Sequence, residues 1–173
     1  DNPFASRGGV AAQVWSLGHR NILGMAFDGA GRLWAHEMGP KGGDELNLIR
    51  KGANYGYPIV SNGDHYDGKV IPPHSTSPEF AAPAISWNPV IAPGDFIFYS
   101  GKLWPEWRNQ PLIAAMQRSG PGIVRVAIEG ERGTEAARYR FDKRLRDIVE
   151  ADDGSLYVIE DGPGGRLLHL TRG

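Results

Sequence analysis

The sequence predicts an all-β protein, and within that class a β-propeller of four-stranded antiparallel blades. Ten stretches of four to six residues have the apolar and β-branched composition of strands, and turn residues close each one. The chain holds 24 glycines and 13 prolines among 173 residues, and no segment repeats its apolar residues with the period of a helix. Many short strands joined by tight turns are typical of a sandwich, a barrel or a propeller.

The predicted strands follow one another along the chain and are separated by turn signals. An Asp-Gly turn at Asp28 divides the first two strands, the glycine-rich loop 39–43 precedes the third, and a Gly-Pro-Gly-Gly run at 162–165 precedes the last. Residues 51–86 have no strand pattern, which predicts a long inserted loop. The strands are expected at residues 24–28, 32–37, 45–49, 95–99, 112–116, 123–128, 138–141, 147–150, 156–160 and 167–170.

A repeat favours the propeller over the other two architectures. Residues 27–40 align with residues 150–163 at a constant offset of 123 residues. Both copies follow the pattern Asp-x-x-Gly-x-Leu-aromatic-x-x-Glu-x-Gly-Pro when the aspartate may slip by one position. Together with the strands of residues 95–141, this spacing fits units of about 40 to 50 residues, and therefore about three blades.

About three blades cannot close a ring, because propellers typically use 4 to 8 blades. An open arc of blades leaves strand edges and an apolar face exposed. We therefore expect these residues to be part of a larger protein, or to complete a ring with another chain.

Charge and composition exclude several classes of function. Nineteen Lys and Arg balance 20 Asp and Glu to a net charge of -1, so the chain has no basic field for nucleic acid. The absence of cysteine excludes a disulfide scaffold, a thiolate zinc site and a thiol nucleophile. No apolar run reaches the roughly 20 residues of a transmembrane helix, and the first residues lack the pattern of a signal peptide. We expect no nucleic-acid partner and no transmembrane segment.

Two arginine-containing stretches are candidate anion sites. Residues 18–21 place His19, Arg20 and Asn21 before a strand, where the arginine could pair with a ligand carboxylate. The alternative is a solvated turn. Arg144 and Arg146 alternate along a strand, so both guanidinium groups lie on one face and could bind an anion. The alternative there is an exposed strand edge whose arginines pair with neighbouring aspartates.

Other polar loops have weaker signals. Residues 39–45 combine glycine backbone with two carboxylates, a composition that suits calcium, but they lack the EF-hand spacing, so an ordinary acidic loop is the alternative. Residues 62–68 are similar and include Tyr66. Gln117 and Arg118 follow a strand and could add polar contacts, unless they form a plain turn. No His-Glu-x-x-His or Gly-x-Ser-x-Gly motif supports zinc proteolysis or serine hydrolysis.

Six motifs occur together along the chain: Gly18-His19-Arg20-Asn21, the run from Glu37 to Asn47, the run from Lys51 to Pro58, the run from Trp87 to Gly94, Arg144-Leu145-Arg146-Asp147 and the run from Asp152 to Tyr157. This set closely resembles the soluble aldose sugar dehydrogenases that use pyrroloquinoline quinone (PQQ), the glucose/sorbosone dehydrogenase family. The resemblance covers essentially the whole chain, which is similar to the C-terminal half of such an enzyme.

The resemblance implies a six-bladed propeller with PQQ and calcium at the mouth of the central channel. It implies that Arg20, Asn21 and Tyr66 contact the cofactor. It also implies that Arg144 and Arg146 neutralise the cofactor carboxylates.

The remaining site residues are also implied by the resemblance. The main-chain carbonyls of Gly39 and Pro40 are expected to bind the calcium beside the quinone. Glu45 and the carbonyl of Tyr55 are expected to bind a second, structural calcium. Gln117 and Arg118 lie near the place where some members carry a lysine over the quinone, and Arg118 could supply that charge.

The function implied is oxidation of the anomeric hydroxyl of an aldose to a lactone. Calcium polarises the quinone carbonyl, a base takes the hydroxyl proton and hydride passes to the cofactor. In the family the general base is a histidine of the N-terminal half, so no residue here is assigned as catalytic and the chain alone is expected to be inactive.

The resemblance also bears on partners and location. The expected partners are an aldose and either the missing N-terminal half or a second copy that closes the ring. A periplasmic or secreted location is implied. The alternative function is a noncatalytic β-propeller module that binds sugar or a protein partner.

Overall fold

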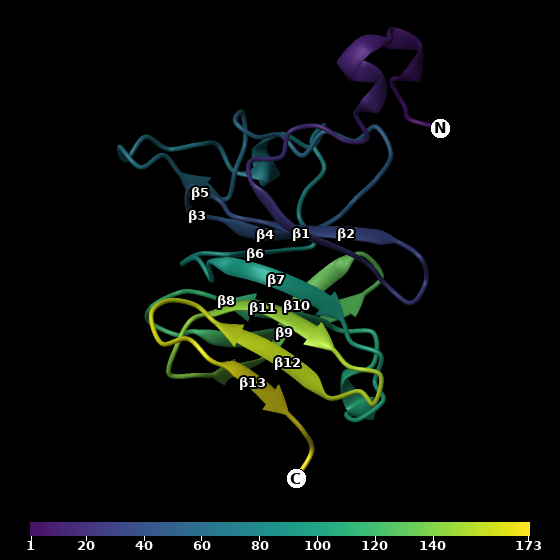
Figure 1. Cartoon of the computed structure of the whole chain (residues 1–173). Coiled ribbons are helices and arrows are strands. Elements are labelled where there is room, and N and C mark those ends of the chain that lie inside the picture. The colour runs from purple at the N-terminus through teal and green to yellow at the C-terminus, as the bar shows by residue number, and fades with distance from the viewer.

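The computed structural model describes residues 1–173, and its regular structure is almost entirely β (Figure 1). Three antiparallel sheets follow one another along the chain, and each is ordered from its first strand outward. The first contains β1 (Ile22–Phe27), β2 (Leu33–Glu37), β4 (Asp44–Leu48) and β6 (Ile85–Trp87). The second contains β7 (Pro93–Phe98), β8 (Pro111–Ala115), β9 (Gly122–Glu129) and β10 (Arg132–Arg140). The third contains β11 (Leu145–Glu150), β12 (Leu156–Glu160) and β13 (Leu167–Leu170).

Helical structure is confined to single 3₁₀ turns and one slightly longer 3₁₀ segment. These are η1 (Ala5–Arg7), η2 (Gly9–Gln13), η3 (His74–Thr76) and η4 (Pro105–Trp107). No helix has both the length and the apolar character needed to cross a bilayer.

The predicted all-β class and the ten predicted strands are confirmed, with shifted ends. β10 begins at Arg132, well before the predicted residue 138. Three short strands were not predicted: β3 (Lys41–Gly42) and β5 (Gly63–Asp64), which pair with each other, and β6. Strands of two or three residues are too short to show a period of two, so the sequence pattern does not reveal them. β5 lies inside the expected loop 51–86, and β6 begins at its end and supplies the outer strand of the first sheet.

The core lies between successive sheets, as expected of propeller blades. Trp34 and Leu46 of the first sheet pack with Phe96 and Ile113 of the second in one cluster of buried side chains. A second cluster joins the opposite face of the second sheet to the third and includes Leu112, Leu145, Ile148 and Leu156. The middle sheet therefore buries both faces, which explains why β8 is buried along its whole length.

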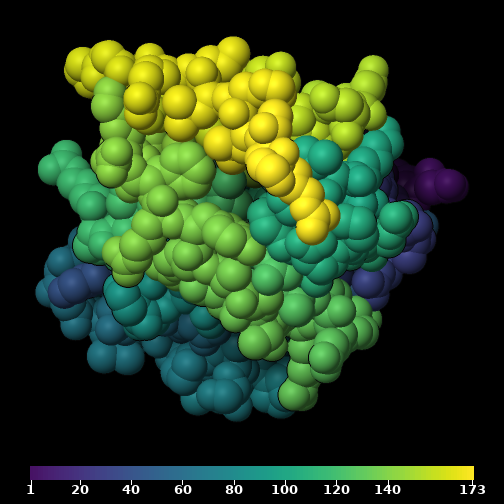
Figure 2. Space-filling model, turned by 90° about the horizontal axis from the view of Figure 1, so that it is seen from below, coloured from purple at the N-terminus to yellow at the C-terminus, as the bar shows by residue number.

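The two end sheets each leave an apolar face uncovered. On β1 the exposed side chains are Leu23, Met25 and Phe27, and on the third sheet they are Val149, Ile159 and Leu167. Figure 2 views the molecule from the C-terminal side, where the yellow C-terminal strands are in full view. The third sheet has three strands where the others have four, so β13 also has a free edge. Faces of this kind are normally covered by another sheet.

Candidate functional site

The predicted binding residues lie at one end of the sheets, where the inner strands β1, β7 and β11 begin. Asp44 lies in the first sheet at the end where β1 starts. Its carboxylate accepts hydrogen bonds from the backbone N–H groups of Ile91 and Ala92, just before β7, at 2.8 and 2.7 Å. A side chain on Gly94 of β7 would meet the backbone carbonyl of Arg146 in β11. The starts of the three inner strands therefore meet at one place, here called the mouth.

All three inner strands have a register shift at the mouth. The shift lies between residues 22 and 24 in β1, between 93 and 96 in β7 and between 145 and 147 in β11. β-bulges redirect side chains and are frequent beside functional sites. The mouth is therefore the part of the inner strands where side chains leave the regular alternation.

Arg20 is held firmly at the mouth. Its backbone N–H donates to Glu37 Oε2 at 2.8 Å, and its guanidinium Nη1 donates to the carbonyl of Met38 at 3.0 Å. The guanidinium lies 5.9 Å from the ring centre of Tyr57 and 6.0 Å from that of Tyr66. Tyr66, which is 74% exposed on the 51–86 segment, therefore lies beside Arg20. A cation beside two aromatic rings is a candidate contact for an anionic or aromatic ligand.

The loop after β2 presents unbonded carbonyl oxygens. Gly39 and Pro40 are buried, and no backbone N–H donates to either carbonyl. Gly39 cannot be replaced without displacing backbone, because a Cβ there would meet the carbonyl of Gly42. Asp44 holds the loop by accepting from the N–H of Gly39 at 3.0 Å. Free carbonyl oxygens fixed by a loop are ligands that calcium prefers, so these two residues fit the calcium expected beside the quinone.

Arg144 and Arg146 share one carboxylate. Arg146 donates to Asp161 Oδ1 at 2.9 Å, and Arg144 donates to Asp161 Oδ2. Hydrogen bonds from Arg146 and Arg144 hold the pKa of Asp161 below its ordinary value. Two guanidinium groups against one carboxylate leave a net positive charge, and both side chains are more than a third exposed. The pair fits the carboxylates of an anionic cofactor.

Three predicted residues are at the same end of the sheets and form no hydrogen bond with Arg144 or Arg146. Asn21 is exposed beside Arg20, and its backbone N–H lies 3.4 Å from Glu37 Oε2. Gln117 follows β8, where its backbone N–H donates to the carbonyl of Ile91 at 3.1 Å, and Arg118 is exposed. These side chains are available to a ligand, and their part in binding remains a prediction.

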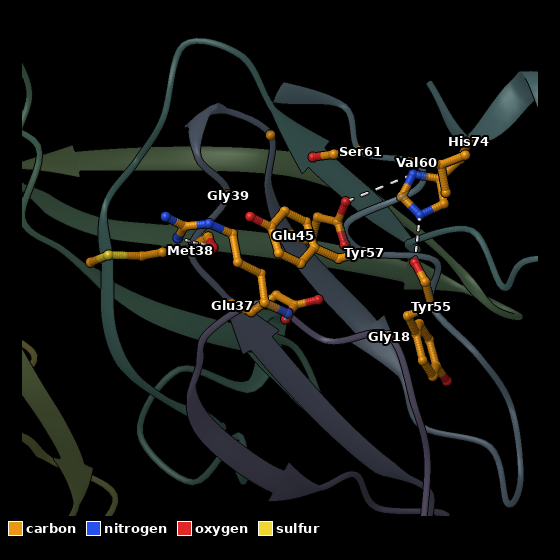
Figure 3. Close-up of a pocket in the computed structure, with 12 residues that line it drawn as sticks. Gly18, Glu37, Met38, Gly39, Glu45, Tyr55, Tyr57, Val60, Ser61 and His74 are labelled. Carbon is orange, nitrogen blue, oxygen red and sulfur yellow. Dashed lines mark hydrogen bonds and ion pairs between the residues drawn. The ribbon is translucent and has the colours of Figure 1, made fainter. Parts of the chain in front are cut away.

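A small cavity connects several predicted residues. It has a volume of about 10 Å³, and Arg20, Gly39, Glu45 and Tyr55 line it together with Glu37 (Figure 3). A space of this size holds about one water-sized atom. Burial and the nearby Glu37 carboxylate raise the pKa of Glu45 to about 8. Two buried carboxylates beside one small space favour a cation or a proton there.

The expected second calcium site contains an unexpected histidine. The carbonyl of Tyr55 lies 2.9 Å from His74 Nε2, while Glu45 Oε1 lies 3.9 Å from His74 Nδ1 (Figure 3). The two nitrogens flank the same ring carbon, so His74 contacts the Tyr55 carbonyl with one nitrogen and faces the Glu45 carboxylate with the other. The calcium expected at Glu45 and the Tyr55 carbonyl stays a prediction. No three His, Cys, Asp or Glu side chains converge on one metal position.

His36 at the end of β2 makes the folded state sensitive to acid. Its side chain is fully buried, neither ring nitrogen has a hydrogen-bond partner, and burial lowers its pKa to about 4. Between pH 6.5 and 4, His36 is therefore protonated in the unfolded chain but stays neutral in the folded chain. We expect His36 to contribute about 3 kcal/mol less to stability at pH 4 than at pH 7.

Urea unfolding of the protein and of His36→Gln at pH 7, 5.5 and 4 measures this contribution. The variant is expected to lose less free energy of unfolding than the parent as the pH falls. Parallel pH curves for the two proteins would contradict the prediction.

Several residues of the site were not predicted from the sequence. Glu37 and Asp44 lie within a motif that was singled out, but only the structure shows that they hold Arg20 and the Gly39 loop. Asp161 lies in the repeated Glu-x-Gly-Pro segment, which could have drawn attention to it. Tyr57 lies in the run from Lys51 to Pro58 but was given no role, and His74 had no signal of its own, because it reaches the site through a long segment.

Packed antiparallel blades with adjacent inner strands define a β-propeller protein, and its candidate ligand site, with cations and oxygen ligands, lies at the mouth. The chain belongs to the glucose/sorbosone dehydrogenase family, since a sequence profile described as "Glucose / Sorbosone dehydrogenase" matches residues 1–169. The predicted family resemblance is thereby confirmed.

Relatives of known name agree with this assignment. Aldose sugar dehydrogenase YliI of Escherichia coli is 35% identical over 178 residues, which cover 99% of this chain and 47% of that protein. Quinoprotein glucose dehydrogenase B of Acinetobacter calcoaceticus is 51% identical over 61 residues, covering 35% of this chain and 12% of that protein. The chain spans about half the length of the E. coli relative.

Solved structures show the same fold. The apo crystal structure of the soluble E. coli aldose sugar dehydrogenase matches with a TM-score of 0.88 and 35% identity, over 99% of this chain and 50% of that one. The PQQ-bound aldose sugar dehydrogenase of Streptomyces coelicolor matches with a TM-score of 0.65 and 26% identity, over 98% of this chain and 46% of that one.

Proposed function

We propose that this chain is the PQQ- and calcium-binding half of a dehydrogenase that oxidises the anomeric hydroxyl of aldose sugars to lactones. The observation that carries the proposal is the meeting of three elements at one mouth: Arg20 beside two tyrosine rings, the free carbonyls of Gly39 and Pro40, and an arginine pair. Membership of the glucose/sorbosone dehydrogenase family and a PQQ-bound relative support it.

When bound, PQQ would supply the carbonyl that accepts the hydride, and calcium would polarise that carbonyl. The residues of this chain bind and orient. Arg144 and Arg146 neutralise the cofactor carboxylates, and Asp161 keeps both guanidinium groups at the mouth. The carbonyls of Gly39 and Pro40 would hold the calcium. Arg20, Asn21 and Tyr66 contact the cofactor, and Gln117 and Arg118 add polar contacts.

The general base is expected to come from the rest of the protein. Most histidines of this chain are engaged elsewhere: His19 bonds the Ser16 hydroxyl, His36 and His74 are buried, and His169 bonds the Ser155 hydroxyl. The two uncovered apolar faces would receive the remaining blades of a six-bladed ring. A periplasmic or secreted location is part of the same proposal, and fractionation of the producing cells would test it.

We expect the purified chain, with PQQ and calcium added, to show no aldose-dependent reduction of a dye. Native mass spectrometry of the same sample measures assembly and uptake of calcium and PQQ together. Uptake of PQQ that requires calcium supports the proposal, whereas a chain that takes up neither contradicts it and favours a noncatalytic module. Turnover by the chain alone would show that the general base lies within residues 1–173.

A further inference from the structure

Two half-buried aspartates lie at the mouth, where the inner strands β7 and β11 touch. Gly94 of β7 has no side chain, and a Cβ there would lie 2.2 Å from the backbone carbonyl oxygen of Arg146 in β11. The register shifts of both strands include this point. The next residues along the two strands are Asp95 and Asp147. Acidic side chains from two neighbouring blades therefore accompany one of the arginines proposed to bind the cofactor.

The carboxylate of Asp95 also occupies the space left by a glycine of the first sheet. The repeat offset places Gly24 of β1 at the position that Asp147 has in β11. A Cβ on Gly24 would lie 2.5 Å from Asp95 Oδ1 and 2.7 Å from His36 Nε2. Burial lowers the pKa of His36 to about 4, so a neutral ring faces Asp95 from β2. The first sheet therefore gives Asp95 room but no positive charge.

The two carboxyl groups face each other without a cation. Arg144 and Arg146 pair with Asp161, and neither Asp95 nor Asp147 forms an ion pair. Burial raises the pKa of Asp95, and so do the charge of Asp147 and a hydrogen bond between the two carboxyl groups. Such a hydrogen bond needs one proton, because an ionised carboxylate can only accept. A shared proton is therefore what relieves the repulsion between the pair.

We propose that Asp95 and Asp147 share one proton, that they are positioning residues for Arg146, and that loss of this proton weakens cofactor binding. The inference rests on the proposed function of Arg146. With the proton, a hydrogen bond joins β7 to β11 beside the bulge that presents Arg146. Once the proton has passed to solvent, two like charges repel across this contact and add a negative charge beside an anion site.

Urea unfolding tests the shared proton without the cofactor. The folded chain holds this proton to a higher pH than the unfolded chain, so its stability is expected to fall as the pH rises from 5 to 8.5. Asp95→Asn can donate to Asp147 and cannot ionise. Its urea midpoint should therefore exceed that of the parent at pH 8.5 and equal it at pH 5. Asp147→Asn should remove the same pH dependence, because the proton belongs to the pair.

Titration with PQQ in the presence of calcium tests the link to Arg146. At pH 8.5 Asp95→Asn should bind PQQ about two- to tenfold more tightly than the parent, because a negative charge beside the anion site is lost. At pH 5 the two proteins should bind PQQ equally. Asp152→Asn is the matched control, since it makes the same change of charge at an exposed turn after β11, away from the mouth. A gain in affinity does not arise from damage to the fold.

The shared proton is overturned if Asp95→Asn is less stable than the parent at every pH, or if its stability has the same pH dependence. Equal PQQ affinity of the parent and Asp95→Asn at pH 8.5 would overturn the link to Arg146. A parent chain that binds no PQQ at any pH contradicts the proposed function, while the unfolding curves still decide whether the pair holds a proton. The proposed function and this inference therefore fail separately.

Discussion

Replacing both Arg144 and Arg146 with alanine is expected to weaken PQQ binding by a factor of 10² to 10⁴. The two guanidinium groups share Asp161 and leave a net positive charge at the mouth. Each hydrogen bond to a charged group contributes about 1.5–3 kcal/mol, so loss of both removes about 3–6 kcal/mol of binding free energy. Titration of the chain with PQQ in the presence of calcium, followed by absorbance, measures the change.

Control variants distinguish whether the loss of PQQ affinity comes from lost charge, from lost hydrogen-bond geometry or from unfolding. The double replacement by lysine keeps both charges but loses the planar fork of donors, so it should recover only part of the affinity. Arg132→Ala is the control, since this exposed arginine begins the outer strand β10, away from the mouth. PQQ affinity that is unchanged in the double alanine variant, with a native circular dichroism spectrum, would remove the arginine pair from the proposed site.

The fold could be predicted from the sequence because the strands and turns of propeller blades have local sequence signals. Turn residues such as Asp28 and short apolar runs mark each strand within a few residues, and the repeat relates the first sheet to the third. β3, β5 and β6 were missed because their positions depend on pairing with strands that are distant in the sequence. β6 reaches β4 only after the long segment that follows the third predicted strand.

From the sequence, only those site residues could be predicted that belong to one recognisable motif. Arg20, Arg144 and Arg146 have recognisable neighbours in sequence, and the structure places them at the mouth. The meeting of Glu45, Tyr55 and His74 depends on the path of the 51–86 segment. The prediction that Glu45 and the Tyr55 carbonyl share a calcium did not include His74, whose ring nitrogens face both groups.

Asp44→Ala is expected to lower the free energy of unfolding by about 3–5 kcal/mol. The Asp44 side chain is 1% exposed and accepts from three backbone N–H groups, those of Gly39, Ile91 and Ala92, at 2.7–3.0 Å. Without the carboxylate these buried donors have no partner, at about 1–3 kcal/mol each. Burial raises the pKa of Asp44, which shows that desolvation of the charge offsets part of this gain. The expected loss is therefore below the full sum.

Urea unfolding of Asp44→Ala, Asp44→Asn and the exposed control Asp142→Ala tests this role. Asparagine has one oxygen acceptor and would turn an N–H₂ group toward one of the three donors, so its loss should lie between those of the alanine variant and the control. Because Asp44 also fixes Gly39, the asparagine variant should bind calcium at the mouth more weakly even where it remains folded. A variant as stable as Asp142→Ala would show that the link between the Gly39 loop and β7 does not depend on this carboxylate.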